Sequence, residues 1–254
     1  MAAAGCDGGG FPPDAGVTPP AAMGTFSLAW SVTDTAGAPI TCDQIGASTV
    51  AISLSSLDRV FGIAESFSCG NSPSTSPAIP IGNYSVAIEL HGFGLDPVTV
   101  PPQSRVVITE GQTTALQPVT FAVNATGNLA LQLAPPAPLT SNCGAGPGGA
   151  AIDGTSITLQ DAAGACLPVT FTRTKNGAPN GTYTASCPGP AVATCIERDE
   201  TLTATSVPSG PYTIHVRGKI GAADCFRNDD SLAVPAQGKA LTRTLNLASS
   251  TPSC

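Results

Sequence analysis

Two histidines, His91 and His215, are the only imidazoles in this 254-residue chain, so a general base that titrates near neutral pH must be one of them. Each histidine follows a tyrosine, Tyr84 or Tyr212, by an odd number of residues in a stretch of alternating apolar residues. Counting by twos from the tyrosines places both histidines on the outward face of a strand. No G-x-S-x-G stretch supplies a nucleophile. The sequence therefore predicts no catalytic residues and no enzyme.

The acidic residues gather at two places, ERDE at 197–200 and NDDS at 228–231. Carboxylate oxygens suit calcium, but neither run has the regular D-x-D-x-D spacing of a calcium loop. The chain also contains no C-x-x-C pair and no Cys/His cluster with the spacing of a zinc site. We therefore expect no metal and no cofactor, with calcium at one of the acidic runs as the alternative.

Nine cysteines in a chain with so little catalytic equipment indicate disulfides that form in an oxidising compartment. Because cysteines bridge in pairs, eight of them can be joined and one is left over.

The residues before Cys6, Ala3-Ala4-Gly5, resemble the lipobox of bacterial lipoproteins, in which small residues precede a cysteine that is acylated and becomes the mature N-terminus. The resemblance implies that Cys6 carries a lipid and that the partner of this end of the chain is a membrane. The basic and apolar regions of a signal peptide are then expected upstream of Met1. The alternative is an alanine-rich start with a chance cysteine, and the choice between inner and outer membrane stays open.

The stretch from residue 7 to residue 22, DGGGFPPDAGVTPPAA, is rich in Gly and Pro and poor in apolar side chains. This composition predicts a disordered or polyproline-like tether. At roughly 3.1 Å per residue, sixteen residues reach at most about 50 Å. Such a tether would hold a folded body clear of the lipid head groups.

The composition limits the remaining partners. The formal net charge is −7, and the ten Lys and Arg residues are scattered, so no basic stripe is available for nucleic acid. No run of 18 apolar residues could cross a bilayer as a helix. Charged residues make up only 11% of the chain, while Gly and Pro number 28 and 24, which is typical of many short strands joined by turns.

A pattern of strands and turns occurs twice. GTFSLAWSVT at 24–33 and GNLALQL at 127–133 each open a copy. IPIGNYSVAIEL at 79–90 then matches SVPSGPYTIHVR at 206–217, and each copy closes with a glycine turn and a final strand near residues 123 and 248. The alternation predicts a core of Phe26, Leu28, Trp30, Val32, Val86, Ile88 and Leu90 in the first copy, and of Leu129, Leu131, Leu133, Ile214 and Val216 in the second.

The order of these features, a strand, a cysteine loop, P-x-G-x-Y-x-V-x-I and a closing strand, resembles carboxypeptidase-regulatory-like and transthyretin-like domains, over about residues 24–123 and 126–248. The resemblance implies an all-β fold of two tandem Ig-like, prealbumin-like Greek-key β-sandwiches. It also implies a scaffold, stalk or binding module, because the motif contains no catalytic residue. The expected boundaries are 1–23 for the tether, 24–124 for the first domain and 125–254 for the second.

Aligning the two copies places Cys42 with Cys143 and Cys69 with Cys187, which predicts the bridges Cys42–Cys69 and Cys143–Cys187. Two insertions in the second copy then carry one cysteine each, so the alignment also predicts the bridge Cys166–Cys195. The remaining pair is Cys225–Cys254.

Together these features predict a non-catalytic lipoprotein, anchored outside the cytoplasm in the periplasm or on the cell surface, whose tandem sandwiches serve as a structural or interaction module. The alternative is an accessory domain that binds carbohydrate or protein. Phe93, which stands between glycines in HGFGLD, is the aromatic side chain best placed for display. A turn aromatic that packs back on its sheet is the expected arrangement.

Overall fold

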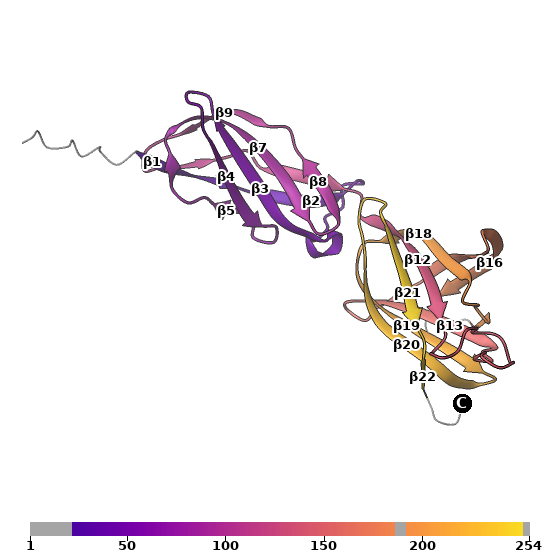
Figure 1. Ribbon diagram of the computed structural model, residues 1–254. Helices are drawn as coiled ribbons and strands as arrows, with labels where there is room; N and C mark the ends of the chain where they lie inside the picture. The colour runs from indigo at the N-terminus through magenta and orange to yellow at the C-terminus, as the bar shows by residue number, and fades with distance from the viewer. Residues whose placement is uncertain (1–21, 186–191, 251–254) are drawn as a thin grey trace, which may run out of the picture.

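The computed structural model describes residues 22–185 and 192–250 and shows two β-sandwiches arranged end to end (Figure 1). The first contains β1 (Met23–Leu28), β2 (Trp30–Asp34), the 3-10 turn η1 (Asp43–Ile45), β3 (Ala47–Ser56), β4 (Gly62–Ser68), β5 (Ser74–Thr75), β6 (Ile79–Pro80), β7 (Gly82–Gly92), β8 (Leu95–Thr99), β9 (Gln103–Ile108), β10 (Thr113–Ala115) and β11 (Val119–Val123). No α-helix occurs in these two described ranges, and none of their segments is a helix long and apolar enough to span a membrane.

The second sandwich contains β12 (Thr126–Ala134), β13 (Gly154–Asp161), β14 (Cys166–Leu167), β15 (Val169–Lys175), β16 (Ala178–Ala185), β17 (Ala193–Thr194), β18 (Glu200–Pro208), β19 (Gly210–Ile220), β20 (Ala223–Val234), β21 (Ala240–Asn246) and β22 (Ala248–Ser249). Residues 1–21, which include Cys6, lie outside the described residues, as do Cys187 and Cys254, while Met23, expected at the end of the tether, is the first residue of β1.

Both sandwiches use the same pattern of strand pairing in two layers. In the first, β1 and β2 pair in parallel with β10 and β11, while β4-β3-β7-β8 forms the opposite sheet. In the second, β12 pairs in parallel with β21, and β13 pairs with β19 as β3 does with β7. The repeat expected from the sequence is therefore a repeat of structure.

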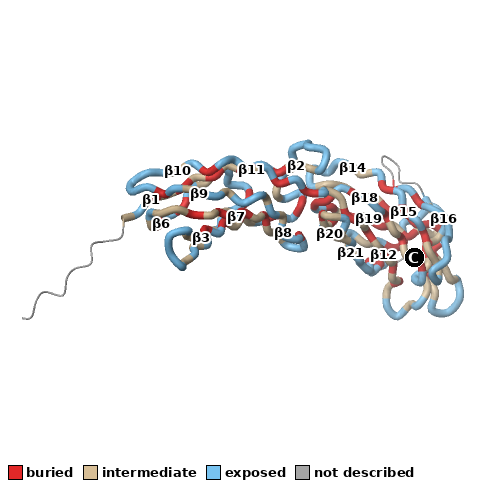
Figure 2. The backbone as a smooth tube through the Cα atoms, turned by 90° about the horizontal axis from the view of Figure 1, so that it is seen from above, coloured by how far each residue is buried: buried red, intermediate tan, exposed pale blue. Residues whose placement is uncertain are grey.

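The alternating residues form the cores, as predicted. Phe26, Leu28, Trp30 and Val32 are no more than 7% exposed, and Leu129, Leu131 and Leu133 no more than 1%. Figure 2 shows the buried residues running through the interior of both sandwiches. Burial of these apolar side chains supplies the main driving force for the fold.

Matching residues of the repeat make matching contacts. The hydroxyl of Tyr84 donates to the carbonyl of Pro80 over 2.7 Å, and that of Tyr212 donates to the carbonyl of Pro208 over 3.0 Å. Burial raises the pKa of both phenols, so both remain neutral donors at ordinary pH. Each tyrosine therefore fixes the corner that its P-x-G-x-Y motif forms.

The sandwiches differ at one strand. In the first, β4 runs alongside β3 in full register. In the second, the equivalent pairing is reduced to the short β14 and β17, and between them the chain crosses to the other layer as the β15–β16 hairpin, which pairs with β18. The extra length of the second copy is thus one added hairpin on one sheet.

Candidate functional site

The two sandwiches are joined by only two residues, Asn124 and Ala125, between β11 and β12. The carbonyl of Asn124 accepts a hydrogen bond from the Gln237 N–H over 2.8 Å, and the carbonyl of Ala125 accepts one from the Ser209 N–H over 2.9 Å. Because both linker carbonyls are bonded to the second sandwich, the linker is held as part of that sandwich.

A clamp across the joint consists of four residues, Gly94 from the β7–β8 turn, Asp96 from the start of β8, and Gln237 and Lys239 from the β20–β21 turn. The Gln237 amide accepts from the Asp96 N–H over 2.7 Å and donates to the Asp96 carbonyl over 3.0 Å. The Lys239 ammonium donates to the Gly94 carbonyl over 2.9 Å and to the Asp96 carboxylate over 2.7 Å. These contacts connect residues 141 to 145 positions apart in the sequence.

The same β20–β21 turn also enters the first core. Ala236 is 2% exposed and packs with the apolar cluster of the first sandwich. Gln237 next to it has a φ of 61°, a left-handed conformation that costs energy for a residue other than glycine. The contacts of its side chain and backbone with Asp96 and Asn124 stabilise that conformation.

An apolar cleft of about 410 Å³ lies beside the clamp, between η1 and the β7–β8 turn on one side and β19–β21 on the other. Phe93 stands at its edge and is 98% exposed, so it does not pack back on its sheet as expected. The other lining side chains that matter here are Asp43, Ile45, Pro211, Val234, Lys239 and Leu241. Phe93 is the one exposed aromatic side chain within the described ranges, so they contain no aromatic row.

The two histidines lie on outward faces of strands, as predicted. His91 contacts the Glu89 carboxylate over 3.0 Å, and His215 contacts the Asp229 carboxylate over 2.6 Å from the neighbouring strand β20. Their side chains are 40% and 30% exposed. The hydrogen bond from His215, with a second contact from Arg217, outweighs partial burial and lowers the pKa of Asp229. Both are contacts between an imidazole and a carboxylate on an open sheet surface.

The acidic runs hold protein groups. Glu200 is paired with the buried Arg173 over 2.8 Å, Asp199 with Lys175 over 3.2 Å, and Asp230 with Arg243 over 3.2 Å. Within the described ranges, no three side chains of His, Cys, Asp or Glu come together as a metal site. The carboxylates of ERDE and NDDS are therefore engaged in the pairing of strands and loops.

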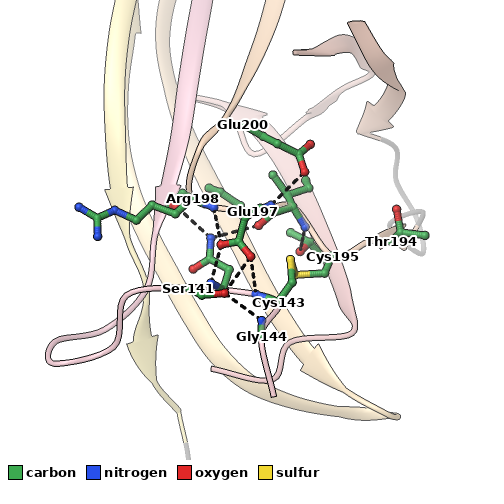
Figure 3. The surroundings of a disulfide bond; sticks show 12 residues. Ser141, Cys143, Gly144, Thr194, Cys195, Glu197, Arg198 and Glu200 are labelled. Atoms are coloured by element: carbon green, nitrogen blue, oxygen red, sulfur yellow. Dashed lines mark hydrogen bonds between the residues drawn. A yellow bond between two sulfur atoms is a disulfide. The ribbon is translucent and has the colours of Figure 1, made fainter. Parts of the chain in front are cut away.

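Glu197 caps the loop of the second disulfide (Figure 3). Its carboxylate accepts from the N–H groups of Asn142 and Cys143 over 2.8 and 3.2 Å and from the Ser141 hydroxyl over 2.8 Å. Partial burial opposes ionisation, but these hydrogen bonds and one from the Arg198 N–H outweigh it and lower the pKa of Glu197.

The structure confirms the bridge Cys42–Cys69 and corrects the prediction for the second sandwich. Cys143 is bonded to Cys195, so the predicted bridges Cys143–Cys187 and Cys166–Cys195 are wrong. The bridged cysteines are 27 positions apart in the first copy and 52 in the second.

The physical reason for the error is the position of the insertion. Cys69 precedes Tyr84 by 15 residues and Cys195 precedes Tyr212 by 17, whereas Cys187 precedes Tyr212 by 25. The sequence alignment divided one added hairpin into two insertions, and the distance to the tyrosine was the signal that could have placed it. Cys166 and Cys225 are disulfide-bonded too, while Cys187 and Cys254 lie outside the described residues, so Cys225–Cys254 stays a prediction.

No local pattern in the sequence indicated the joint, because Asp96, Gln237 and Lys239 are ordinary polar residues in or beside turns. The available signal was positional. HGFGLD follows β7 at one end of the first sandwich, and PAQGK follows the antiparallel β20 beside the start of β19, at the opposite end of the equivalent sheet. Stacking the sandwiches end to end through a linker of two residues therefore brings them together.

No protein-family model and no curated sequence matches the chain. Among solved structures, the Bacillus anthracis TIE protein is similar at 14% identity and a TM-score of 0.35, over 90% of this chain and 34% of its own. The minor pilin GBS52 of Streptococcus agalactiae is similar at 8% identity and a TM-score of 0.29, over 90% of this chain and 97% of its own. A variant of the major pilin of Streptococcus pyogenes is similar at 11% identity and a TM-score of 0.30, over 90% of this chain and 99% of its own. This chain thus spans about a third of the Bacillus anthracis protein.

Proposed function

We propose that the chain is a non-catalytic, extracytoplasmic module in which two sandwiches act as one stiff structural unit, anchored to the bacterial cell envelope by a lipid on Cys6. The observation that carries the proposal is the clamp between Asp96 of the first sandwich and Gln237 and Lys239 of the second.

Stiffness follows from where the contacts lie. The linker Asn124–Ala125 is bonded to the second sandwich, and the clamp from Asp96 to Gln237 and Lys239 lies beside it, with Gln237 taking part in both. Two attachments side by side oppose bending more strongly than one, and the buried Ala236 adds an apolar contact to them. A stiff pair of sandwiches suits a spacer or stalk, which has to keep its length under load.

NMR relaxation tests this stiffness. In the wild-type protein we expect amides of both sandwiches to give one rotational correlation time, because the two bodies tumble together. The double variant Gln237→Ala, Lys239→Ala should give two shorter times. Lys219→Ala, which removes a surface ion pair with Asp224 away from the joint, is the matched control and should behave as wild type. Separate tumbling of the two sandwiches in the wild type would overturn the proposal.

The disulfides indicate an extracytoplasmic location, because such bridges persist in oxidising compartments. The lipid on Cys6 is the finer part of the proposal and rests on the lipobox-like Ala3-Ala4-Gly5. Produced from its full gene in its own host, the protein should enter the detergent phase on phase separation, and Cys6→Ser should move it to the aqueous phase. Equal partitioning of the two forms would remove the anchor from the proposal.

The absence of catalysis is likewise a proposal, supported by the pairing of each histidine with a carboxylate on an open strand face. The double variant His91→Gln, His215→Gln should fold and retain any binding function. If a hydrolase or transferase activity is found in the protein and disappears in this variant, the proposal fails.

We propose the domain boundaries expected from the sequence, 24–124 and 125–254, on the ground that each range contains its own apolar cluster. Residues 24–124 expressed alone should keep the cooperative unfolding of the first sandwich, with some loss from the missing Ala236. Failure of that fragment to fold would mean that the two sandwiches form one folding unit.

The second candidate function is the binding of a carbohydrate or a protein segment in the apolar cleft, favoured by the exposed Phe93 at its edge. Clefts between domains are common ligand sites, and exposed aromatics supply stacking surfaces. Chemical shift changes in Gly94 and Leu241 on addition of oligosaccharides, lost in Phe93→Ala, would support it.

A further inference from the structure

Exposed apolar side chains gather at one end of the first sandwich. Seven large apolar side chains of the described ranges are exposed, and five of them lie at this end. We call these five the apolar tip; they are Met23 at 38% exposure, Leu57 at 54%, Val60 at 108%, Ile81 at 39% and Val107 at 51%. Isolated exposed apolar residues are ordinary, but a group on one surface indicates an interaction site.

Backbone contacts show that the tip is one surface. The Ile81 N–H donates to the carbonyl of Ala22 over 3.1 Å, which brings Ile81 beside Met23. The Leu57 N–H donates to the carbonyl of Asn83 over 2.8 Å, and Asn83 is the register partner of Val107. The members of the tip thus come from four segments that meet at the start of β7.

The most exposed part of the tip is held in place. In the β3–β4 turn, the Asp58 carboxylate accepts from the N–H and the side-chain amide of Asn83 over 3.1 and 2.9 Å. This pins the turn to β7, so that Leu57 and Val60 project beyond it with Arg59 between them. A fixed turn loses little conformational entropy when its apolar side chains are buried against a partner.

The position of the tip indicates the partner. The described chain begins at residue 22, at the same end of the first sandwich as the β3–β4 turn and away from the second sandwich (Figures 1 and 2). Sixteen residues lie between Cys6 and Met23 and span at most about 50 Å when extended. Whatever holds Cys6 is therefore always within reach of the tip.

We propose that the apolar tip is a lipid-contacting surface, which inserts Leu57 and Val60 at the level of the head groups while Arg59 contacts the phosphates. The proposal rests on the proposed lipid anchor at Cys6. Two aliphatic side chains bind a bilayer only weakly from solution, but a tether converts this into a contact at high effective concentration. The result is an upright module, with the first sandwich on the membrane and the second directed outward.

The test replaces the natural anchor, so that it does not depend on lipidation. The full chain with an N-terminal hexahistidine segment is bound to phosphatidylcholine vesicles that contain a nickel-chelating lipid. Val60→Trp reports the tip, and Phe93→Trp at the joint is the matched control, since both positions are fully exposed. On the vesicles, we expect the emission of Val60→Trp, and not that of Phe93→Trp, to shift to the blue and to be quenched by brominated phosphatidylcholine.

A second measurement uses Leu57→Ser with Val60→Ser. On vesicles of phosphatidylcholine alone, we expect the double variant to bind about tenfold more weakly than wild type, because less apolar surface is buried. An unchanged spectrum of Val60→Trp on the vesicles, or equal quenching at both positions, would overturn the proposal. So would a dimer in sedimentation that the double variant abolishes, because a second copy would then be the partner. If Cys6→Ser partitions as wild type but Val60→Trp is quenched, the anchor fails and the tip stands.

Discussion

The two sandwiches use different donors to satisfy the same backbone carbonyl, that of the second bridged cysteine. In each, a disulfide holds the loop that precedes the tyrosine strand, and the carbonyl of its second cysteine needs a hydrogen-bond donor. In the first, the Trp30 indole N–H donates to the Cys69 carbonyl over 2.7 Å. In the second, the Arg173 guanidinium donates to the Cys195 carbonyl over 3.0 Å. An aromatic donor in one copy is replaced by a charged donor in the other.

The difference follows from the repeat itself. The position of Trp30 in the first copy corresponds to Leu133 in the second, and leucine has no donor. Arg173 comes from the added β15–β16 hairpin, reaches the carbonyl from the opposite sheet, and is only 7% exposed. A buried cation requires an anion, which Glu200 supplies over 2.8 Å. The hairpin thus made the second sandwich dependent on charge, while the first depends on aromatic packing.

Arg173→Met is expected to have the largest effect. It leaves the Glu200 carboxylate buried without its cation, which costs about 3 to 5 kcal/mol in the free energy of unfolding of the second sandwich. Native-state hydrogen exchange in β18 and β19 measures this cost, and the Trp30 fluorescence reports the first sandwich, which should be unaffected.

Two controls accompany this variant. Lys175→Met removes an exposed ion pair with Asp199 and should change stability by less than about 1 kcal/mol. The double variant Arg173→Met, Glu200→Leu removes both buried charges and should recover most of the loss. If the double variant is as unstable as Arg173→Met, packing and not charge accounts for the effect.

Removal of the disulfides compares the copies directly. On the chain-entropy relation, a bridge across 27 positions contributes about 3.5 kcal/mol and one across 52 positions about 4 kcal/mol. We therefore expect Cys143→Ala with Cys195→Ala to lower stability slightly more than Cys42→Ala with Cys69→Ala. Chemical denaturation measures both. A larger loss in the first sandwich would mean that native-state contacts outweigh loop length.

The disulfide pairing also shows how much of the structure could be predicted from the sequence. Alternation placed the core residues and both histidines correctly because a strand has a period of two, and the repeated P-x-G-x-Y motif located the matching corners. The Cys143–Cys195 bridge was missed because the added hairpin joins the other sheet, and a strand that changes sheets leaves no mark in local periodicity. The clamp was missed because it connects residues more than 140 positions apart, for which no local pattern exists.

Trp30→Phe tests the contribution of the indole donor in the first sandwich. The Cys69 carbonyl loses its donor while the ring stacking with Phe67, at 6.2 Å between centroids, is partly kept. An unsatisfied buried carbonyl costs about 1 to 3 kcal/mol, which is less than a stranded charge. Denaturation followed by circular dichroism should show this loss only in the unfolding transition of the first sandwich. A loss of stability as large as that of Arg173→Met would mean that the uncharged and the charged donor do not differ in their contribution.

The smallest expected effect is the response of the second sandwich to acid. The pKa of Glu197 in the folded chain lies below its ordinary value of 4.5, so the unfolded state takes up its proton first as the pH falls. The stability that Glu197 contributes is therefore complete above its ordinary pKa and is lost as the pH falls through its folded value. Glu197→Gln should lower stability at neutral pH and flatten its decline below pH 4.5, as measured by denaturation across this range. Because the carboxylate holds the Asn142 and Cys143 N–H groups, the flattening should appear in amides of the Cys143–Cys195 loop and not around Trp30. An equal slope in variant and wild type would mean that other carboxylates, such as Asp229 beside His215, carry the acid response.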